Sequence, residues 1–318
     1  MTTFCCPSFV ICEGKGCHLN LRFHQLRALV GVVEHGGIRA AARVLNISQA
    51  ALTKSLRDLE ADANLPLLVR SSRGVSLTPA GDKLLARAKL IVRQLDLASD
   101  ELAQAADAQR GHINVACTPL ASIKYLSLAL QMFRSRYPHV QVNLSEGLIP
   151  RALPRLRDGS IDLAFVADTG DLMAGEFTTQ AIRSYRQVMV VREGHPVLRR
   201  LSAQAVAELE WIVTDRAAAS SNGQLATMFK QCGVTPPTRI VVCDSLSIQS
   251  LLLGSDAVTF IAADLTTLPH FAGITQVSVP GLEPGQLNLA LLHRPDVPLL
   301  PSMAYFSECM IQVCLNDA

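Results

Sequence analysis

Polar and basic residues recur along the segment Gln49–Ala61 in a pattern that suits the reading of DNA bases. Glutamine can hydrogen-bond an adenine edge in two places, alanine and threonine offer apolar contact to thymine methyl groups, and lysine and arginine meet guanine or phosphate. The residues of these types are Ser48, Gln49, Ala50, Thr53, Lys54 and Arg57. The alternative is an ordinary solvated helix face, because glutamine, threonine and lysine are common on protein surfaces.

Three predicted helices would position these side chains. Apolar residues recur at helical spacing over Phe23–Val33, and a short helix follows over Ile38–Leu45. The third helix runs from about Gln49 to Ala61, with Ser48 as its N-cap. Its buried stripe would consist of Leu52, Leu56 and Leu59. A stripe on that side turns the polar residues outward, as in the second helix of a helix-turn-helix.

Two short strands are predicted next, near Leu67–Arg70 and Val75–Leu77, with a tight turn between them. Such a hairpin would lie along the DNA backbone as a wing. The backbone contacts expected from it are those of Arg70, Ser71 and Arg73. Thr78 caps the following helix ahead of Pro79 and is also placed for a phosphate contact.

A long helix is predicted from Pro79 to Ala108, roughly 45 Å in length. Its apolar residues are separated alternately by four and three positions, which is the heptad repeat of a seam between two helices. They are Leu84, Ala88, Ile91, Leu95, Ala98, Leu102 and Ala105. The strict repeat favours a linker that pairs two copies of the chain. The alternative is one amphipathic helix packed on its own domain.

From His112 onward, predicted strands and helices alternate, which is typical of an α/β domain with mostly parallel, buried strands. A helix is expected over 122–136 and a strand over Val188–Arg192. An enzyme is disfavoured, because the chain shows no nucleophile elbow, dinucleotide glycine fingerprint or phosphate loop. A transporter's solute-binding protein is disfavoured by the presence of residues 21–108 and by the lack of a signal peptide.

Composition and charge agree with a DNA-binding module on a larger body. The chain has 318 residues, of which 49% are hydrophobic, enough for two domains with separate cores. Its net charge of +2 is uneven, because residues 21–80 carry +4 and the remainder −2. No apolar run is long enough to span a membrane, and no basic residue precedes the first apolar stretch, so a cytoplasmic protein is expected.

Four of the nine cysteines crowd the start of the chain. Cys12, Cys17 and His18 could hold a metal in principle, but their spacing matches no familiar zinc motif. Residues 1–20 are therefore expected to be a flexible leader, and no metal or cofactor is expected. The other five cysteines lie in apolar segments and are expected to be small core residues without disulfides.

The residues from Leu21 to Gly81 resemble the N-terminal signature of LysR-type transcriptional regulators. The matching residues are Ala40-Ala41-Ala42, Leu45, Ser48-Gln49, Ala51-Leu52, Leu59-Glu60, Leu65-Pro66-Leu67, Arg70, Leu77-Thr78 and Ala80-Gly81. Ala50 stands where the family usually has proline, Asn64 where it has glycine and Val69 where it has glutamate. The resemblance implies a winged helix-turn-helix that binds promoter DNA, with the helix from Gln49 in the groove.

The resemblance covers nearly the whole chain after residue 20. It implies an α/β protein with an N-terminal all-α winged helix-turn-helix, a long linker helix, and a periplasmic-binding-protein-like effector domain of two α/β subdomains. The expected ranges are 1–20 for the leader, 21–79 for the DNA-binding domain, 80–109 for the dimerising linker helix and 110–318 for the effector domain. Subdomain I would take about 110–182 and 292–318, and subdomain II about 183–291.

In such a fold the effector lies between the subdomains, near strand ends and helix N-termini. The predicted strand that ends at Cys117 leads to Thr118, Pro119 and Leu120, and the resemblance adds the facing residues Leu148, Ile149, Asp168 and Ser245. Each could equally be an ordinary loop or cap residue. Because helix N-termini favour anions, a small organic anion is the expected effector.

The resemblance also implies partners. A dimer formed through the linker helix would present two recognition helices to an inverted repeat, and two dimers would form a tetramer. Effector binding would then change the bend of double-stranded promoter DNA and the access of RNA polymerase. No membrane partner is expected.

Overall fold

The computed structural model describes residues 20–71, 74–105, 111–168, 175–216, 218–221 and 223–317. The chain divides into two units, Met1–Gln94 and Leu95–Ala318. Apart from Asn20, the predicted leader lies outside the described residues. Within the described ranges, no helix has both the length and the apolar character that a bilayer span requires.

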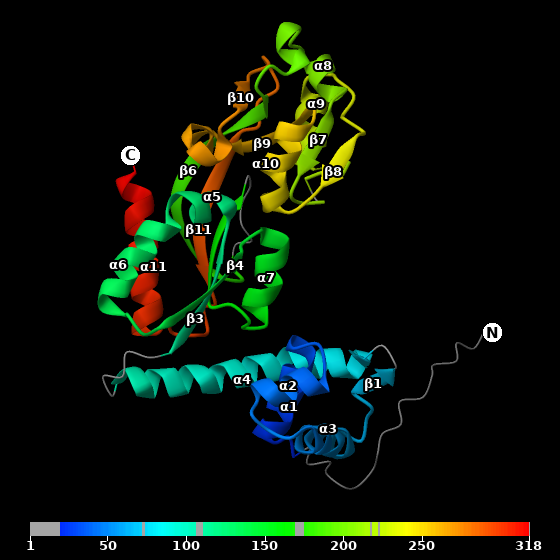
Figure 1. Cartoon of the computed structure of the whole chain (residues 1–318), viewed down its shortest axis with the longest axis vertical. Coiled ribbons are helices and arrows are strands. Elements are labelled where there is room, and N and C mark those ends of the chain that lie inside the picture. The colour runs from blue at the N-terminus through cyan, green and yellow to red at the C-terminus, as the bar shows by residue number, and fades with distance from the viewer. Residues whose placement is uncertain are drawn as a thin grey trace, which may run out of the picture. The chain divides into compact units, whose positions relative to one another are not determined.

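The first unit consists of helices and a two-stranded hairpin (Figure 1). Its elements are α1 (Phe23–Glu34), α2 (Ile38–Val44), α3 (Gln49–Ala63), β1 (Leu68–Ser71), β2 (Gly74–Leu77) and the first part of α4 (Pro79–Ala105). β1 and β2 pair in antiparallel register, with Leu68 opposite Leu77. The order of elements confirms the one that the apolar periodicity predicts.

The core of this unit is the apolar stripe of α3 packed against α1 and α2. Leu52 and Leu56 are fully buried and Leu59 is 1% exposed, in one cluster with Leu29 and Ala41. Steps of four and three residues put the three α3 leucines on one side of the helix, as predicted. The opposite side of α3 is therefore left for contacts outside the unit.

Two buried or partly buried polar groups fix α3 to its neighbours. The fully buried Gln25 donates from Nε2 to Asp62 Oδ2 at 2.8 Å, which ties α1 to the end of α3. Glu60 Oε1 accepts hydrogen bonds from the N–H groups of Leu67 and Leu68 at 2.8 and 3.0 Å. This carboxylate therefore sets the direction in which the hairpin leaves α3.

The predicted seam of α4 divides between two environments. Ala88 is fully buried in the core of the first unit, and Leu84 packs against the same core. Ile91 and Leu95 are each 47% exposed and Leu102 is 73% exposed. The first part of the seam is thus wrong as a free surface, because the helix-turn-helix needs those side chains to close its core. The rest of it remains open.

The second unit is built on one long sheet. Its strands are β3 (His112–Cys117), β4 (Gln141–Glu146), β5 (Leu163–Asp168), β6 (Thr178–Arg192), β7 (Glu210–Val213), β8 (Ile240–Val242), β9 (Ala257–Ala262), β10 (Ile274–Val277) and β11 (Gln286–His293). Their order is β4-β3-β5-β11-β6-β9-β7-β8, with β10 also paired to β6. β3 runs parallel to β4 and β5, and β7 runs parallel to β8 and β9.

Two α/β subdomains result, because β6 belongs to both ends of this sheet. Its residues Thr178–Arg186 pair with β11, and Gln187–Val190 pair with β9. We call the part with β3, β4 and β5 the first subdomain and the part with β7, β8 and β9 the second. The predicted strand Val188–Arg192 is only the last third of β6, since the earlier residues are mostly exposed and polar.

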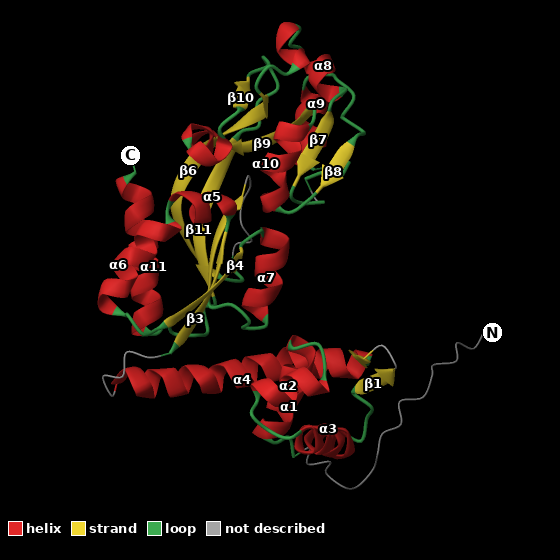
Figure 2. Ribbon diagram, in the orientation of Figure 1, coloured by secondary structure: helices red, strands yellow, loops and turns green. Residues whose placement is uncertain are grey.

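Seven helices cover the described strands of this unit. They are α5 (Pro119–Lys124), α6 (Leu126–Arg136), α7 (Ile149–Arg157), α8 (Ala203–Ala207), α9 (Gln224–Gln231), α10 (Ser245–Gly254) and α11 (Pro301–Asn316). Figure 2 shows α6 and α11 side by side on one face of the first subdomain and α7 on the other. Phe133 and Phe306 are fully buried between helices and sheet, and Trp211 is fully buried in the second subdomain.

The predicted single helix over 122–136 is wrong, because the structure divides it at Tyr125. Tyr125 is 1% exposed, accepts a hydrogen bond from the Tyr185 hydroxyl at 2.9 Å and donates to Asp317 Oδ2 at 3.0 Å. Lys124 pairs with the same Asp317 carboxylate. The break between α5 and α6 thus anchors the C-terminal end of the chain.

Replacing Asp317 with asparagine is expected to reduce stability at neutral pH but not in acid. The hydrogen bond from Lys124 is the main cause that holds the pKa of Asp317 below its ordinary value of 3.8. A carboxyl group with a lowered pKa stabilises the fold above its ordinary pKa and ceases to do so as the pH falls through the lowered value. The carboxyl is 41% exposed, so the loss should be about 1 kcal/mol or less.

Thermal melts of the two proteins at pH 7 and below pH 3 would check this, with the difference between them expected to shrink in acid. Glu193→Gln is the control, because Glu193 is exposed and its substitution removes a carboxylate outside this cluster. A difference that persisted unchanged below pH 3 would contradict the assignment.

Candidate DNA-reading helix and strand-end site

The exposed side of α3 carries the residue types predicted to read DNA. Gln49, Ala50, Lys54 and Arg57 are exposed, and Thr53 is partly exposed. Ser48 caps the helix, since its hydroxyl accepts a hydrogen bond from the Ala51 N–H at 3.1 Å. The face is thus polar and basic at the N-terminal end of the helix, which is the end that enters the major groove in helix-turn-helix proteins.

A tight turn between α2 and α3 sets the angle of this face. Asn46 has a φ of 54°, in the left-handed region, and the Ile47 N–H closes the turn on the Ala42 carbonyl at 3.0 Å. Asparagine tolerates this conformation better than most residues. Together with the buried leucines behind it, the turn holds α3 as a rigid, outward-facing rod.

The structure describes only part of the hairpin residues that are predicted to contact the DNA backbone. Arg70 and Ser71 lie in β1, and the backbone there pairs with β2. Arg73 lies outside the described residues. The Thr78 hydroxyl donates to the Pro66 carbonyl at 2.8 Å and accepts from the Gly81 N–H at 3.1 Å. Thr78 is therefore a helix cap, as predicted, but its hydroxyl hydrogen is already engaged and does not point to a phosphate contact.

The predicted effector residues gather where three parallel strands end. β4, β3 and β5 end side by side, with Cys117 paired to both Glu146 and Phe165. Thr118 follows β3 at once, is 5% exposed, and donates its N–H to the Phe165 carbonyl at 2.7 Å. Ligands of open α/β folds bind at this edge of the sheet.

Gly147 allows β4 to approach β3 closely at this edge. Its N–H donates to the Cys117 carbonyl at 2.8 Å, and a Cβ at this position would lie 2.7 Å from the Cys117 carbonyl carbon and 2.8 Å from the Thr118 nitrogen. Only glycine fits such an approach. The chain around Thr118 is therefore tightly packed on the strand side.

Ser245, the first residue of α10, meets this edge from the second subdomain. Its hydroxyl donates to Glu146 Oε1 at 2.5 Å, and Arg151 Nη1 donates to Glu146 Oε2 at 2.7 Å. We call Thr118, Glu146–Leu148 and Ser245 the strand-end site. Glu146 and Arg151 were not predicted, although a glutamate that ends an alternating strand directly before glycine was a usable signal.

The other predicted effector residues lie in or next to this site and have different roles. Pro119 and Leu120 begin α5, and Leu120 is 2% exposed and belongs to the core. Leu148 is the N-cap of α7 and Ile149 is its first residue, packed against buried residues of the first subdomain. Asp168 ends β5 at the same sheet edge, paired with Asn288. Leu120 and Ile149 therefore support the site from behind.

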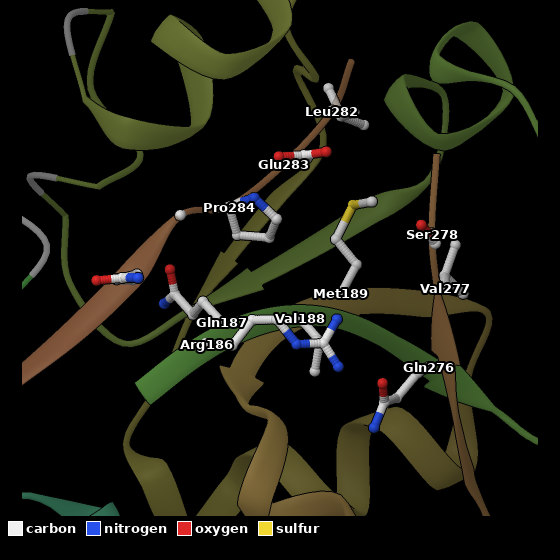
Figure 3. Close-up of a pocket in the computed structure, with 12 residues that line it drawn as sticks. Arg186, Gln187, Val188, Met189, Gln276, Val277, Ser278, Leu282, Glu283 and Pro284 are labelled. Carbon is white, nitrogen blue, oxygen red and sulfur yellow. The ribbon is translucent and has the colours of Figure 1, made fainter. Parts of the chain in front are cut away.

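A separate cavity of about 390 Å³ lies where the loop before β11 leaves β6 and β10 (Figure 3). Its buried lining includes Met189, Val277 and Leu282, while Arg186 and Glu283 are exposed. None of the predicted effector residues lines it. Its polar and apolar groups come from the crossing strands and their loops, not from the ends of parallel strands.

Metal binding finds no support in the part of the chain that the structure describes. No group of three or more His, Cys, Asp and Glu side chains there is arranged to hold an ion. Cys12, Cys17 and His18 lie outside the described residues. The five described cysteines are free. Cys117, Cys309 and Cys314 are buried, as expected for core residues, whereas Cys232 and Cys243 are only partly buried.

Comparison with known proteins shows the same two parts. Residues 23–82 match the model of the bacterial regulatory helix-turn-helix protein, lysR family, and residues 106–315 match the LysR substrate binding domain. The regulator GbpR of Rhizobium radiobacter is 30% identical over 249 residues, covering 76% of this chain and 81% of its own. The SDS degradation transcriptional activation protein of Pseudomonas sp. is 29% identical over 305 residues, covering 92% and 95%.

Solved structures show the same fold. CbnR in complex with its target DNA has a TM-score of 0.63 at 22% identity, covering 92% of this chain and all of its own. A substituted full-length OxyR from Pseudomonas aeruginosa has a TM-score of 0.65 at 16% identity, covering 92% and 99%.

The fold and the α3 surface define a transcriptional regulator with a DNA-binding helix-turn-helix and an effector-binding α/β domain. The chain belongs to the LysR family.

Proposed function

We propose that this regulator reads an inverted repeat in promoter DNA as a homodimer and responds to a small organic anion bound at the strand-end site. The main support for DNA reading is the arrangement of side chains on α3. Its exposed Gln49, Lys54 and Arg57 lie opposite the fully buried Leu52 and Leu56. A helix with one polar, basic face and a rigid apolar backing fits the major groove as a unit. The role is regulatory and not catalytic, and is exercised in the cytoplasm.

The open part of the α4 seam supports the dimer. The side chains of Ile91, Leu95 and Leu102 are large, apolar and exposed, and they follow the heptad spacing of the predicted seam. Such a stripe favours burial against a second helix. Two dimers joined as a tetramer would bend the DNA between their sites, and that bend would control the access of RNA polymerase.

The strand-end site supports an anionic effector. The Thr118 hydroxyl is in a residue that is 5% exposed, and it has no hydrogen-bond partner among the described residues. Ser245 begins a ten-residue helix, whose N-terminal end favours negative charge and whose first N–H donates to the Glu146 carboxylate. A carboxylate or sulfonate could satisfy both groups, whereas an amine could not. Subdomain closure on this anion would be coupled to the DNA bend.

Replacing Gln49 with alanine is expected to change which bases are preferred, whereas Lys54→Ala should weaken binding to all duplexes alike. Loss of a two-point adenine contact costs about 1–3 kcal/mol at the contacted base pair. Loss of a phosphate contact lowers the salt dependence of binding, log K against log salt, by about 1. Selection of binding sites from random duplexes, followed by titrations at several salt concentrations, would measure both effects.

An unchanged selection profile for Gln49→Ala would show that α3 is oriented differently in the groove. Absence of any salt-sensitive duplex binding by the unaltered protein would refute the proposed function itself. Gln94→Ala, an exposed glutamine on α4, is the matched control and should change neither measurement.

A further inference from the structure

One hydrogen-bonded contact joins the end of β4 in the first subdomain to the start of α10 in the second. The Ser245 hydroxyl donates to Glu146 Oε1 at 2.5 Å, and the Ser245 N–H donates to the same oxygen at 3.3 Å. Both bonds are partly buried and involve an ionised acceptor, which makes them stronger than bonds between neutral groups. The contact therefore resists separation of the two subdomains at this edge.

Glu146 also has a partner within its own subdomain. Arg151, in α7, donates from Nη1 to Glu146 Oε2 at 2.7 Å. If the subdomains separated, Glu146 would keep this arginine and the start of α10 would be hydrated. No buried charge would be left unpaired by the loss of this contact.

A second contact across the subdomains has the same construction. Lys124, at the end of α5, donates to Asp264 Oδ2 at 2.9 Å in the second subdomain and pairs with Asp317 beside its own helix. If the subdomains separated, the Lys124 ammonium group would lose Asp264 but would keep the Asp317 carboxylate as its partner.

We propose that Glu146 and Ser245 form a latch that holds the subdomains together while no effector is bound. The anionic group of the effector displaces the Glu146 carboxylate from the start of α10, so that closure is then held by the ligand. This role rests on the proposed function, because it assumes an organic anion beside Thr118. Glu146 is thus an internal competitor of the effector, and two carboxylates at one helix start repel each other.

The test uses the full-length protein without effector and measures the alkylation of Cys243 by iodoacetamide. Cys243 is a free, partly buried thiol two residues before Ser245, and Cys232, also free and partly buried, serves as the internal reference. Glu146→Gln weakens the acceptor, and Ser245→Ala removes the donor hydroxyl while leaving both carboxylates in place. Glu176→Gln is the matched control, because Glu176 pairs with Arg157 inside one subdomain. Quenched time points are analysed by peptide mass spectrometry.

Both latch variants are expected to label Cys243 at least threefold faster, with Cys232 and the Glu176→Gln control unchanged. Burial is the main cause that raises the pKa of Cys243, and the carboxylates of Asp244 and Glu146 raise it further. Faster labelling in Glu146→Gln alone would therefore reflect lost charge, and would overturn the latch. Unchanged labelling in both variants would overturn it as well. Trp211 emission, from a fully buried side chain, verifies that each variant is folded.

A reporter fused to the regulated promoter separates the latch from the proposed function. With effector absent, both latch variants should shift transcription severalfold from the level of the unaltered protein, and Glu176→Gln should not. Faster labelling with unchanged transcription would keep the mechanical contact but refute its regulatory role. If the unaltered protein did not bind DNA at all, the proposed function itself would be refuted.

Discussion

Replacing Leu56 with alanine is expected to lower the free energy of unfolding of the DNA-binding unit by about 2–5 kcal/mol. Leu56 is fully buried in α3 and packs in one cluster with residues of α1 and α2. Removal of its side chain leaves a cavity behind the DNA-reading face, because the surrounding helices can relax only in part. For a unit of this size the helical melting transition should fall by about 10 °C or more.

Far-UV circular dichroism would follow the helices, and tryptophan emission would follow the second unit alone. The chain has a single tryptophan, Trp211, which is buried in the second unit. The control is Leu65→Ala, since Leu65 is 54% exposed in the same unit and should cost little. Equal destabilisation by both substitutions would show that the α3 core does not carry the stability of the unit. DNA affinity at a temperature above the lowered transition should be lost with Leu56→Ala only.

Placing glutamate at both Ile91 and Leu95 is expected to dissociate the proposed dimer and to lower affinity for an inverted repeat by about 10²-fold or more. Each residue is 47% exposed on α4, so the change leaves the core of the single chain intact. In a seam, the charges of two copies would face each other in an apolar contact. With one half-site bound, the second recognition helix would no longer be held at a high local concentration.

Sedimentation velocity would report the oligomeric state, and titration with a whole site and a half-site would report the affinity. Leu315→Glu is the control, since it places one glutamate at an exposed leucine of α11, away from the seam. A double variant that remained dimeric would exclude the α4 seam as the dimer contact. Unchanged half-site affinity together with weakened whole-site affinity is the expected combination.

The sequence predicts the DNA-binding unit well because its core is local. The α3 stripe of Leu52, Leu56 and Leu59 follows helical spacing within one element, and the structure buries all three. The first part of the α4 seam was misread for the opposite reason. A heptad repeat does not distinguish packing of Ala88 on its own unit from packing on another copy of the chain, because an apolar side chain is favourable in both contacts.

The second unit shows where periodicity ceases to be informative. Most of β6 was missed because its first residues are exposed and polar, and pairing with β11 from a distant part of the chain makes them a strand. Glu146 was missed because its partner Ser245 is 99 positions away. The spacing of residue types predicts contacts within one helix or strand. It does not predict contacts between segments that are far apart in the sequence, such as the pairing of β11 with β6.

The return of β11 also determines the order in which the chain can fold during its synthesis. The packing partners of α3 all lie in the first unit, so this part can complete its core soon after it leaves the ribosome. The second unit must wait, because β11 lies between β5 and β6 and connects the two halves of the sheet. A nascent chain stalled before Gln286 would therefore contain a folded DNA-binding unit and an incomplete second unit, in which the edges of β5 and β6 that pair with β11 are exposed.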